Sequence, residues 1–408
     1  MTILNINKFY FIRGGAERFF FELAKLLEEK GHQVIPFSMK HKNNFKSDYE
    51  KYFVSEVQTE KVSISLQGLR TVGRFFWSFE AQRKLKKIVK NEKPELAILH
   101  NIYHQISPSI LPILKKYNIP IILIAHDYGL LSANYNMFVK GMVYDKICGS
   151  GFLNCLKDKC VKDSWLASLV CGLETWFHHQ VLDVYKKNID RVIAPSKFMR
   201  EMFIKADWRR EKLAYLPYFI KQPTFNNQQL TKKGEYILYF GRLSQEKGVD
   251  VLIKAMKNLP DINLKIVGSG PEESKVKKQI INNKIDNIEM LGYKAGKELE
   301  RVIAGSQFVI VPSVWYENCP MSVLEAYSLG VPALVSNIGG LSEMIPSQDK
   351  NFMFQPADEK DLQDKIRFLW NNQEILNRAG KRVKEFVQEN NNPEKYYEKL
   401  MGIYKNIS

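Results

Sequence analysis

Short apolar runs alternate along the chain with stretches whose apolar residues recur every three to four positions. The first run is Thr2–Ile6, and about Ala16–Lys30 follows with apolar residues on one helical stripe. Runs of this length are typical of buried parallel strands, and the stretches between them are typical of covering helices. The later runs lie at 34–38, 95–100, 119–128, 191–196, 236–240, 264–268, 288–291, 308–313 and 332–336. The pattern predicts an α/β protein with parallel sheets.

The alternation is interrupted by an unpatterned stretch rich in Pro, Asn and Lys, residues 216–234. A chain of 408 residues is long for one core, so this stretch predicts a linker between domains 1–215 and 235–392. Asn392-Pro393 then ends the helical pattern. The last segment, 393–408, predicts a helix with the apolar stripe Tyr396, Tyr397, Leu400 and Tyr404.

Two carboxylates, Glu317 and Glu325, lie in a loop and helix that follow a strand-like run. Pro320 suits the first turn of a helix and Gly330 suits its end, which predicts a helix from about Pro320 to Leu329. The N–H groups at its start favour an anion, and ligands bind beyond the carboxyl ends of parallel strands. Glu317 is expected at the lip of that crevice. The alternative is a pair of solvated glutamates near a helix start.

Two cations lie in the loop Gly241–Gly248, between the run 236–240 and a helix predicted from Val249. Arg242 and Lys247 suit a diphosphate, because Arg presents a fork of donors and Lys a point charge. No Asp-x-Asp occurs in the chain, so no carboxylate-bound Mg²⁺ is expected to hold that diphosphate. The sequence therefore predicts a diphosphate-binding site that uses no metal or other cofactor.

Six motifs occur in a fixed order: GGAER, HD, GR-x4-KG, VGSGP, LGY and E-x7-E. Together they resemble the retaining GT-B glycosyltransferases of sequence family 4, of the bacterial cell-surface polysaccharide type. The resemblance implies two Rossmann-like domains facing each other across a cleft. It also implies that the C-terminal domain binds a nucleotide-diphosphate sugar and that the last helix crosses back onto the N-terminal domain. No covalent nucleophile is expected, since the leaving diphosphate is thought to take the acceptor proton.

The resemblance assigns roles to individual positions. It implies that His126 contacts the transferred sugar, that Glu325 holds the ribose, and that Glu317 and the amides after it hold the sugar. The implied catalytic residues are His126, Glu317, Arg242 and Lys247. The implied donor-binding residues are Gly14, Gly15, Gly241, Arg242, Lys247, Asn318, Cys319, Pro320, Met321 and Glu325. His100 and His104 are second-rank candidates for acceptor contact, and a turn without a ligand remains the alternative for the glycine pair.

The net charge of +16 is concentrated in the first half of the chain. Residues 1–215 hold 34 Lys and Arg against 21 Asp and Glu, and residues 216–408 hold 26 against 23. Because no nucleic-acid-binding motif is present, we expect an anionic membrane or a lipid-phosphate acceptor rather than nucleic acid. Apolar residues 69, 72, 76 and 79 have helical spacing among basic residues, which predicts either a membrane-contacting helix or an ordinary core-facing one.

The first residues have the pattern of a β-strand rather than that of a signal peptide. No apolar run is long enough to span a bilayer. We therefore expect a cytoplasmic enzyme, peripheral at the cytoplasmic face of the membrane. Cys148, Cys155 and Cys160 lack the C-x2-C spacing of structural zinc sites. Reduced thiols are expected there. Some proteins that this chain resembles carry a cysteine-rich insertion at this place, but with more cysteines, so the resemblance leaves metal binding at these three residues open.

The motifs together predict a retaining, metal-independent glycosyltransferase. It is expected to move a hexose from a UDP- or GDP-linked sugar to a sugar or lipid-linked glycan, in cell-surface polysaccharide biosynthesis. One alternative is a nucleotide-sugar 2-epimerase of the same fold, which needs no second substrate. Another is a non-catalytic scaffold, against which the intact Arg242, Lys247, Glu317 and Glu325 argue.

Overall fold

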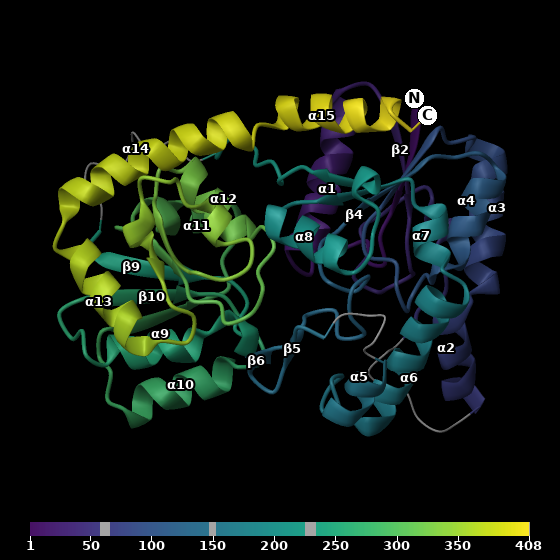
Figure 1. Cartoon of the computed structure of the whole chain (residues 1–408). Coiled ribbons are helices and arrows are strands. Elements are labelled where there is room, and N and C mark those ends of the chain that lie inside the picture. The colour runs from purple at the N-terminus through teal and green to yellow at the C-terminus, as the bar shows by residue number, and fades with distance from the viewer. Residues whose placement is uncertain (58–65, 147–151, 225–233, 408) are drawn as a thin grey trace. The chain divides into compact units, whose positions relative to one another are not determined.

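The computed structural model describes residues 1–57, 66–146, 152–224 and 234–407 (Figure 1). Contacts between residues divide the chain into two compact units. The first unit comprises Met1–Val139, Tyr144–Leu216 and Tyr397–Ser408, and the second comprises Lys140–Val143 and Pro217–Tyr396. Within the described ranges, no helix is long and apolar enough to cross a bilayer.

The first unit is built on a parallel sheet in the order β2-β1-β3-β4-β7-β8. The chain leaves β1 for β2 on one side and returns to β3 on the other, so β1 and β3 flank the point at which the strand order reverses. Polar groups that follow these two strands are therefore brought to one edge of the sheet. The strands are β1 (Thr2–Ile6), β2 (Gln33–Phe37), β3 (Leu96–Leu99), β4 (Ile121–Ile124), β7 (Arg191–Ala194) and β8 (Leu213–Tyr215).

Helices cover this sheet with apolar stripes. The predicted stripe of the first helix is buried, because Phe19, Leu23, Leu26 and Leu27 of α1 are each 2% exposed or less. At the edge of the same sheet, the short strand β8 was not predicted from the sequence. The helices are α1 (Gly15–Glu29), α2 (Leu66–Phe76), α3 (Phe79–Glu92), α4 (Leu111–Lys116), α5 (Phe152–Asp158), α6 (Trp165–Trp176), α7 (Val184–Asn188) and α8 (Lys197–Lys205).

The predicted basic helix around residues 69–90 is two helices. The chain breaks at Ser78, whose hydroxyl accepts a hydrogen bond from the Ala81 N–H (3.2 Å) and caps α3. Phe79, predicted to belong to the apolar stripe, is consequently 75% exposed. Leu85 and Ile88 form the core-facing side of α3 instead. The prediction of one continuous apolar stripe was wrong, because a new helix begins after the N-cap Ser78 and presents a different face to the core.

The second unit is also built on a parallel sheet, in the order β11-β10-β9-β12-β13-β14. This is the arrangement of dinucleotide-binding folds, with the strand order reversing between β9 and β12. The strands are β9 (Tyr236–Phe240), β10 (Asn263–Val267), β11 (Ile288–Gly292), β12 (Val309–Val311), β13 (Ala333–Ser336) and β14 (Met353–Phe354). The helices are α9 (Val249–Met256), α10 (Glu273–Asn282), α11 (Gly296–Ala304), α12 (Met321–Ser328), α13 (Glu359–Trp370) and α14 (Gln373–Asn390).

The chain ends in α15 (Pro393–Lys405), which is separated from α14 by a break near Asn391. The division between the units falls inside α15. Tyr396 packs on Phe219 with ring centroids 5.0 Å apart, both in the second unit. The next residue, Tyr397, belongs to the first unit, where its hydroxyl lies 2.8 Å from His32 Nε2.

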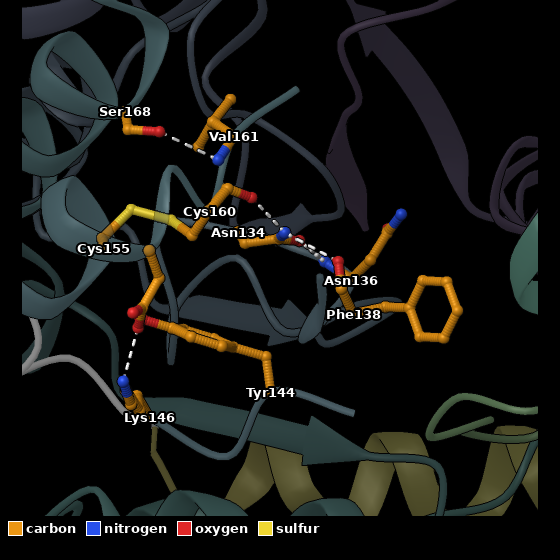
Figure 2. The surroundings of a disulfide bond; sticks show 10 residues. Asn134, Asn136, Phe138, Tyr144, Lys146, Cys155, Cys160, Val161 and Ser168 are labelled. Carbon is orange, nitrogen blue, oxygen red and sulfur yellow. Dashed lines mark hydrogen bonds and ion pairs between the residues drawn. A yellow bond between two sulfur atoms is a disulfide. The ribbon is translucent and has the colours of Figure 1, made fainter. Parts of the chain in front are cut away.

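A disulfide joins Cys155, in the middle of α5, to Cys160 (Figure 2). The expectation that these two residues are reduced thiols is therefore wrong for this structure, and Cys148 lies outside the described residues. The Asn134 side-chain amide donates to the carbonyl of Cys160 (2.5 Å). A short strand pair, β5 (Phe138–Val139) and β6 (Met142–Val143), lies earlier in the chain. The spacing of the cysteines alone could not tell which of the three thiols would meet.

Candidate functional site

The loops that follow β9, β10 and β12 touch one another through glycines. At Gly268, after β10, a Cβ atom would lie 1.9 Å from the Gly241 carbonyl oxygen. At Gly248 a Cβ atom would lie 1.9 Å from the carbonyl oxygen of Pro312, which follows β12. Both positions have positive φ, so larger side chains would be strained as well as crowded. The three loops are consequently held at one edge of the sheet, where the strand order reverses.

A lysine and a glutamate pair at this edge. The Lys247 ammonium donates to Glu317 Oε1 at 2.6 Å, and the Ser313 hydroxyl donates to the same oxygen at 2.6 Å. Burial raises the pKa of the Glu317 carboxyl. The positive charge and hydrogen bond of Lys247, with the Ser313 hydrogen bond, outweigh that effect and hold the pKa below its ordinary value. The site therefore contains a carboxylate that stays ionised although it is 4% exposed.

Glu317 was expected at the lip of the crevice, whereas the structure buries its side chain beneath the loop. The backbone explains this position. The carbonyl of Glu317 accepts a hydrogen bond from the Gly340 N–H at 2.7 Å, and Gly339 packs directly against the Glu317 backbone. Lys247 also lies over the Trp315 ring, 5.3 Å from its centroid. The loop after β12 therefore turns the carboxylate toward Lys247.

The helix α12 begins at Met321, one residue after the predicted start, with Pro320 as its N-cap. Its first N–H groups have no partners within the helix and form a positive end at the same sheet edge as Lys247. Asn318 and Cys319, just before it, are buried. Glu325, one turn inside the helix, is partly exposed. The implied donor-binding residues 318–321 and Glu325 therefore lie on one loop and helix.

Arg242 follows Gly241 in the loop after β9 and is exposed. Its guanidinium forms no ion pair with any residue in the described ranges. Its carbonyl accepts a hydrogen bond from the Tyr239 hydroxyl (2.8 Å), which fixes the backbone of the loop. Burial raises the pKa of Tyr239, so this hydroxyl remains a donor. The backbone at Arg242 is therefore fixed, while its guanidinium group is accessible to solvent.

In the first unit, His126 and His100 lie with their rings nearly parallel, 4.9 Å apart. His100 Nδ1 is 2.6 Å from His126 Nε2, and His100 Nε2 is 2.9 Å from Asn5 Oδ1. Burial lowers the pKa of both rings, to about 3 for His126, so both are neutral near pH 7. The Asn5 side-chain oxygen accepts a hydrogen bond from the His100 Nε2–H. His126 Nε2 then donates to His100 Nδ1, and Nδ1 is the acceptor nitrogen of His126.

A second group of ionisable side chains lies beside His126. Asp127 accepts hydrogen bonds from the Tyr103 hydroxyl and the Gly129 N–H (2.9 Å). Lys8, which follows β1, lies over the Tyr103 ring at 5.1 Å. Burial lowers the pKa of Lys8 and raises the pKa of Asp127, and their mutual attraction opposes both shifts. Lys8 and Tyr103 were not predicted, although the position of Lys8, two residues after the end of a buried strand, was a usable signal.

The glycine pair begins α1. Gly14 is the N-cap of the helix, with extended backbone, and both glycines are exposed. A Cβ atom at Gly14 would meet nothing closer than 3.8 Å, so the fold of this unit does not itself require glycine there. His104, the remaining second-rank candidate, is not in the His126 group. Its Nδ1 lies 2.8 Å from Glu174 Oε2.

The two parallel sheets with covering helices define a protein built of two Rossmann-like α/β units, the second with a cation–carboxylate pair at its reversal point. Comparison with family models is more specific. Residues 13–221 match the model described as Glycosyltransferase Family 4, and residues 221–386 match the model described as Glycosyl transferases group 1. The chain belongs to this glycosyltransferase family, as its motifs predicted.

Individual relatives are distant. An uncharacterized glycosyltransferase of Methanocaldococcus jannaschii is 29% identical over 49% of this chain and 55% of its own length. The O-antigen biosynthesis glycosyltransferase WbnH of Escherichia coli is 29% identical over 42% of this chain and 47% of its own. The chain thus spans about half the length of these two relatives. An uncharacterized protein of the Klebsiella pneumoniae cps region is 23% identical over 84% of this chain and 87% of its own.

Solved structures confirm the predicted GT-B fold. The structure of Anabaena HepE in complex with UDP superposes with a TM-score of 0.70 at 17% identity, covering 100% of both chains. Sucrose-phosphate synthase of Thermosynechococcus elongatus superposes with a TM-score of 0.72 at 18% identity, covering 100% of this chain and 98% of its own. At this level of identity the likeness establishes the fold alone.

Proposed function

We propose that this chain is a retaining glycosyltransferase that moves a hexose from a nucleotide-diphosphate sugar to a glycan acceptor in cell-surface polysaccharide biosynthesis. The single observation that carries the proposal is the Lys247–Glu317 pair at the reversal point of the second sheet. A cation and a buried ionised carboxylate, beside the positive end of α12, suit a ligand that is both anionic and rich in hydroxyl groups. A nucleotide-diphosphate sugar is such a ligand.

In the proposed reaction the acceptor hydroxyl oxygen bonds to the anomeric carbon while the bond from that carbon to the diphosphate oxygen breaks. The acceptor proton passes to the departing diphosphate oxygen, on the same face of the sugar, so configuration is retained. Arg242 and Lys247 stabilise the negative charge that develops on the diphosphate. Glu325 holds the ribose, and Glu317 holds a sugar hydroxyl. The donor site uses no metal in this proposal.

His126 is proposed to contact the transferred sugar through Nδ1, the nitrogen that its pairing with His100 leaves as an acceptor. Because both imidazoles are neutral near pH 7, this contact is a hydrogen bond and not an ion pair. The open space at Gly14 supports a role for the glycine pair in admitting a ligand, since packing in the first unit does not demand glycine there.

The nucleotide is proposed to be UDP. HepE is described in complex with UDP, with UDP and glucose, and with UDP-glucose. TarM is described in complex with fondaparinux, α-GlcNAc-glycerol and UDP. These ligands belong to those proteins, and they support UDP as the first nucleotide to test here.

The acceptor is proposed to be lipid-linked and met at an anionic membrane surface, to which the first unit attaches reversibly. Arg83, Lys86, Lys87 and Lys90 are exposed on α3. Lys84, in contrast, is engaged by Glu80 at 3.2 Å. One side of α6 also exposes apolar residues to solvent, namely Trp165, Leu166, Leu173 and Trp176. Exposed tryptophans and exposed lysines are both features of helices that lie in a membrane interface.

The proposed function is tested by incubating the purified protein with UDP-, GDP- and ADP-linked hexoses, with and without lipid-linked glycans. NMR of the product gives the configuration of the new bond. We expect acceptor-dependent transfer from a UDP-hexose with retention. Epimerised donor formed without acceptor would instead identify an epimerase. Stabilisation by none of the three nucleoside diphosphates in thermal-shift measurements would contradict a donor site altogether.

A further inference from the structure

A partly buried polar cluster in the first unit lies outside the proposed sugar-contacting group. It consists of His104, in the loop after β3, with Cys171 and Glu174 on α6. One ligand atom from each residue lies within 4.8 Å of the other two. Cys171 is a free thiol, unlike the disulfide-bonded Cys155 and Cys160. A nitrogen, a sulfur and a carboxylate oxygen therefore converge from two segments of the chain.

The helix α6 presents this cluster inward and apolar residues outward. Cys171 and Glu174 are three positions apart, so they share one helical face. Glu174 is 3% exposed, whereas Trp165 and Trp176 of the same helix are 54% and 47% exposed. A helix that only packed on a core would have the opposite arrangement. The inward polar face therefore has a purpose other than apolar packing.

The buried carboxylate of Glu174 lacks an adequate donor. Its Oε2 lies 2.8 Å from His104 Nδ1, yet neither atom makes a hydrogen bond of acceptable geometry within the described ranges. His178 lies on the other side, with Nδ1 3.8 Å from Glu174 Oε1. The other nitrogen of His178 donates to the Phe76 carbonyl at 2.8 Å, so in the neutral ring Nδ1 presents a lone pair. A buried carboxylate between these two imidazoles needs a positive charge beside it, which either a protonated His104 or a bound cation would supply.

The backbone around the cluster is fixed. His104 adopts a φ of +64°, the left-handed region that costs a non-glycine residue free energy. Its ring packs against Phe75 at 5.3 Å. After Glu174, α6 continues into a π-helical turn, Phe177–Val181, an irregularity that is frequent at functional sites. At its other end, α6 is tied to the disulfide segment, because the Val161 N–H donates to Ser168 Oγ at 3.0 Å (Figure 2).

We propose that His104, Cys171 and Glu174 bind a zinc ion that fastens α6 to the loop after β3. Imidazole nitrogen, thiolate and carboxylate oxygen are a zinc ligand set, with the fourth position left to water. On binding, the Cys171 thiol gives up its proton to solvent and the His104 ring binds as the neutral form. The two anionic ligands then balance the charge of the ion, which suits a buried site. The alternative is a metal-free ion pair between His104 and Glu174.

The test measures zinc in tag-free protein purified without chelators, by mass spectrometry of the metal. We expect about one zinc ion per chain. Glu174→Gln and Cys171→Ser should each lower zinc affinity by about 100-fold or more, since even outer residues of such sites change affinity 10- to 100-fold. His41→Asn and Glu22→Gln, which remove the same kinds of group from elsewhere in the unit, should leave zinc content unchanged. Zinc content that is unaffected in both cluster variants would overturn the proposal.

Cobalt substitution keeps the test decisive if a variant fails to fold. Wild-type protein stripped of zinc should bind Co²⁺ and develop the visible bands of a four-coordinate site and a thiolate charge-transfer band. Cys171→Ser should lose the charge-transfer band alone. Stripped wild-type protein that remains folded and gives neither band would show that the cluster is an ion pair. UDP affinity should be unchanged on stripping, so failure of this proposal is distinguishable from failure of the donor site.

Discussion

Removing either partner of the Lys247–Glu317 pair should have unequal effects on local stability. Lys247→Met leaves a carboxylate whose side chain is 5% exposed, that keeps the Ser313 hydrogen bond and that has lost its cation. Glu317→Gln leaves an ammonium whose side chain is 25% exposed and that water can reach. Breaking a fully buried pair costs about 3–5 kcal/mol. We expect about 2–3 kcal/mol for Lys247→Met, because the site is only partly closed, and about 1 kcal/mol for Glu317→Gln.

Hydrogen exchange of peptides spanning β12 and α12 measures this local stability without requiring the whole chain to unfold in one step. For Lys247→Met, a loss of about 2–3 kcal/mol corresponds to exchange that is faster by about 30- to 150-fold. For Glu317→Gln, a loss of about 1 kcal/mol corresponds to exchange that is faster by about 5-fold. Lys254→Met, at an exposed position of α9, is the matched control and should change neither value. A larger effect of Glu317→Gln than of Lys247→Met would refute the reasoning, because it would place the unsatisfied charge on the wrong partner.

The same pair determines a pH dependence. The pKa of Glu317 is lowered in the folded chain, so the unfolded chain binds the proton first as pH falls. The stabilisation is complete above the ordinary value of 4.5 and is lost as pH falls through the lower folded value. The stability difference between wild type and Lys247→Met should therefore be largest near neutral pH and shrink on acidification, because Glu317 of the variant, buried without Lys247, takes up its proton at a higher pH than in wild type. A difference that grew on acidification would have the wrong sign. Both variants should also lose about 100-fold or more in turnover.

Arg242→Ala should lower turnover by about 100-fold with no requirement for added Mg²⁺, and strict Mg²⁺ dependence in a transfer assay would contradict the metal-free donor site. Glu325→Gln should weaken UDP binding by about 10- to 100-fold, the scale of one hydrogen bond to a charged group. Calorimetry without sugar measures this, and unchanged affinity would argue against the ribose contact. The double variant Arg83→Glu/Lys87→Glu should reduce low-salt binding to anionic vesicles, since each basic residue contributes about 1 kcal/mol. Lys278→Glu, the control, should not reduce this binding. If wild-type protein does not bind such vesicles, a membrane-bound acceptor is contradicted and a soluble acceptor is expected.

The sequence alone determined the fold class and the motifs of the donor half. Apolar runs and helical stripes depend on local periodicity, so β1, α1 and the start of α12 fall within a residue of their predicted positions. The strand–loop–helix motifs around Arg242 and Glu317 could be recognised because parallel strands deliver their following loops to one edge. The family assignment followed from the order of those motifs.

Tertiary structure decided what each side chain contacts. The sequence could not show that Lys247 meets Glu317 across the reversal point, because the two residues are 70 positions apart and the approach depends on glycines in neighbouring loops. It could not show the pairing of His100 with His126, or which cysteines would join. The grouping of His104 with Cys171 and Glu174 depends on how α6 is rotated against the loop after β3. Only tertiary packing turned the polar face of this helix inward.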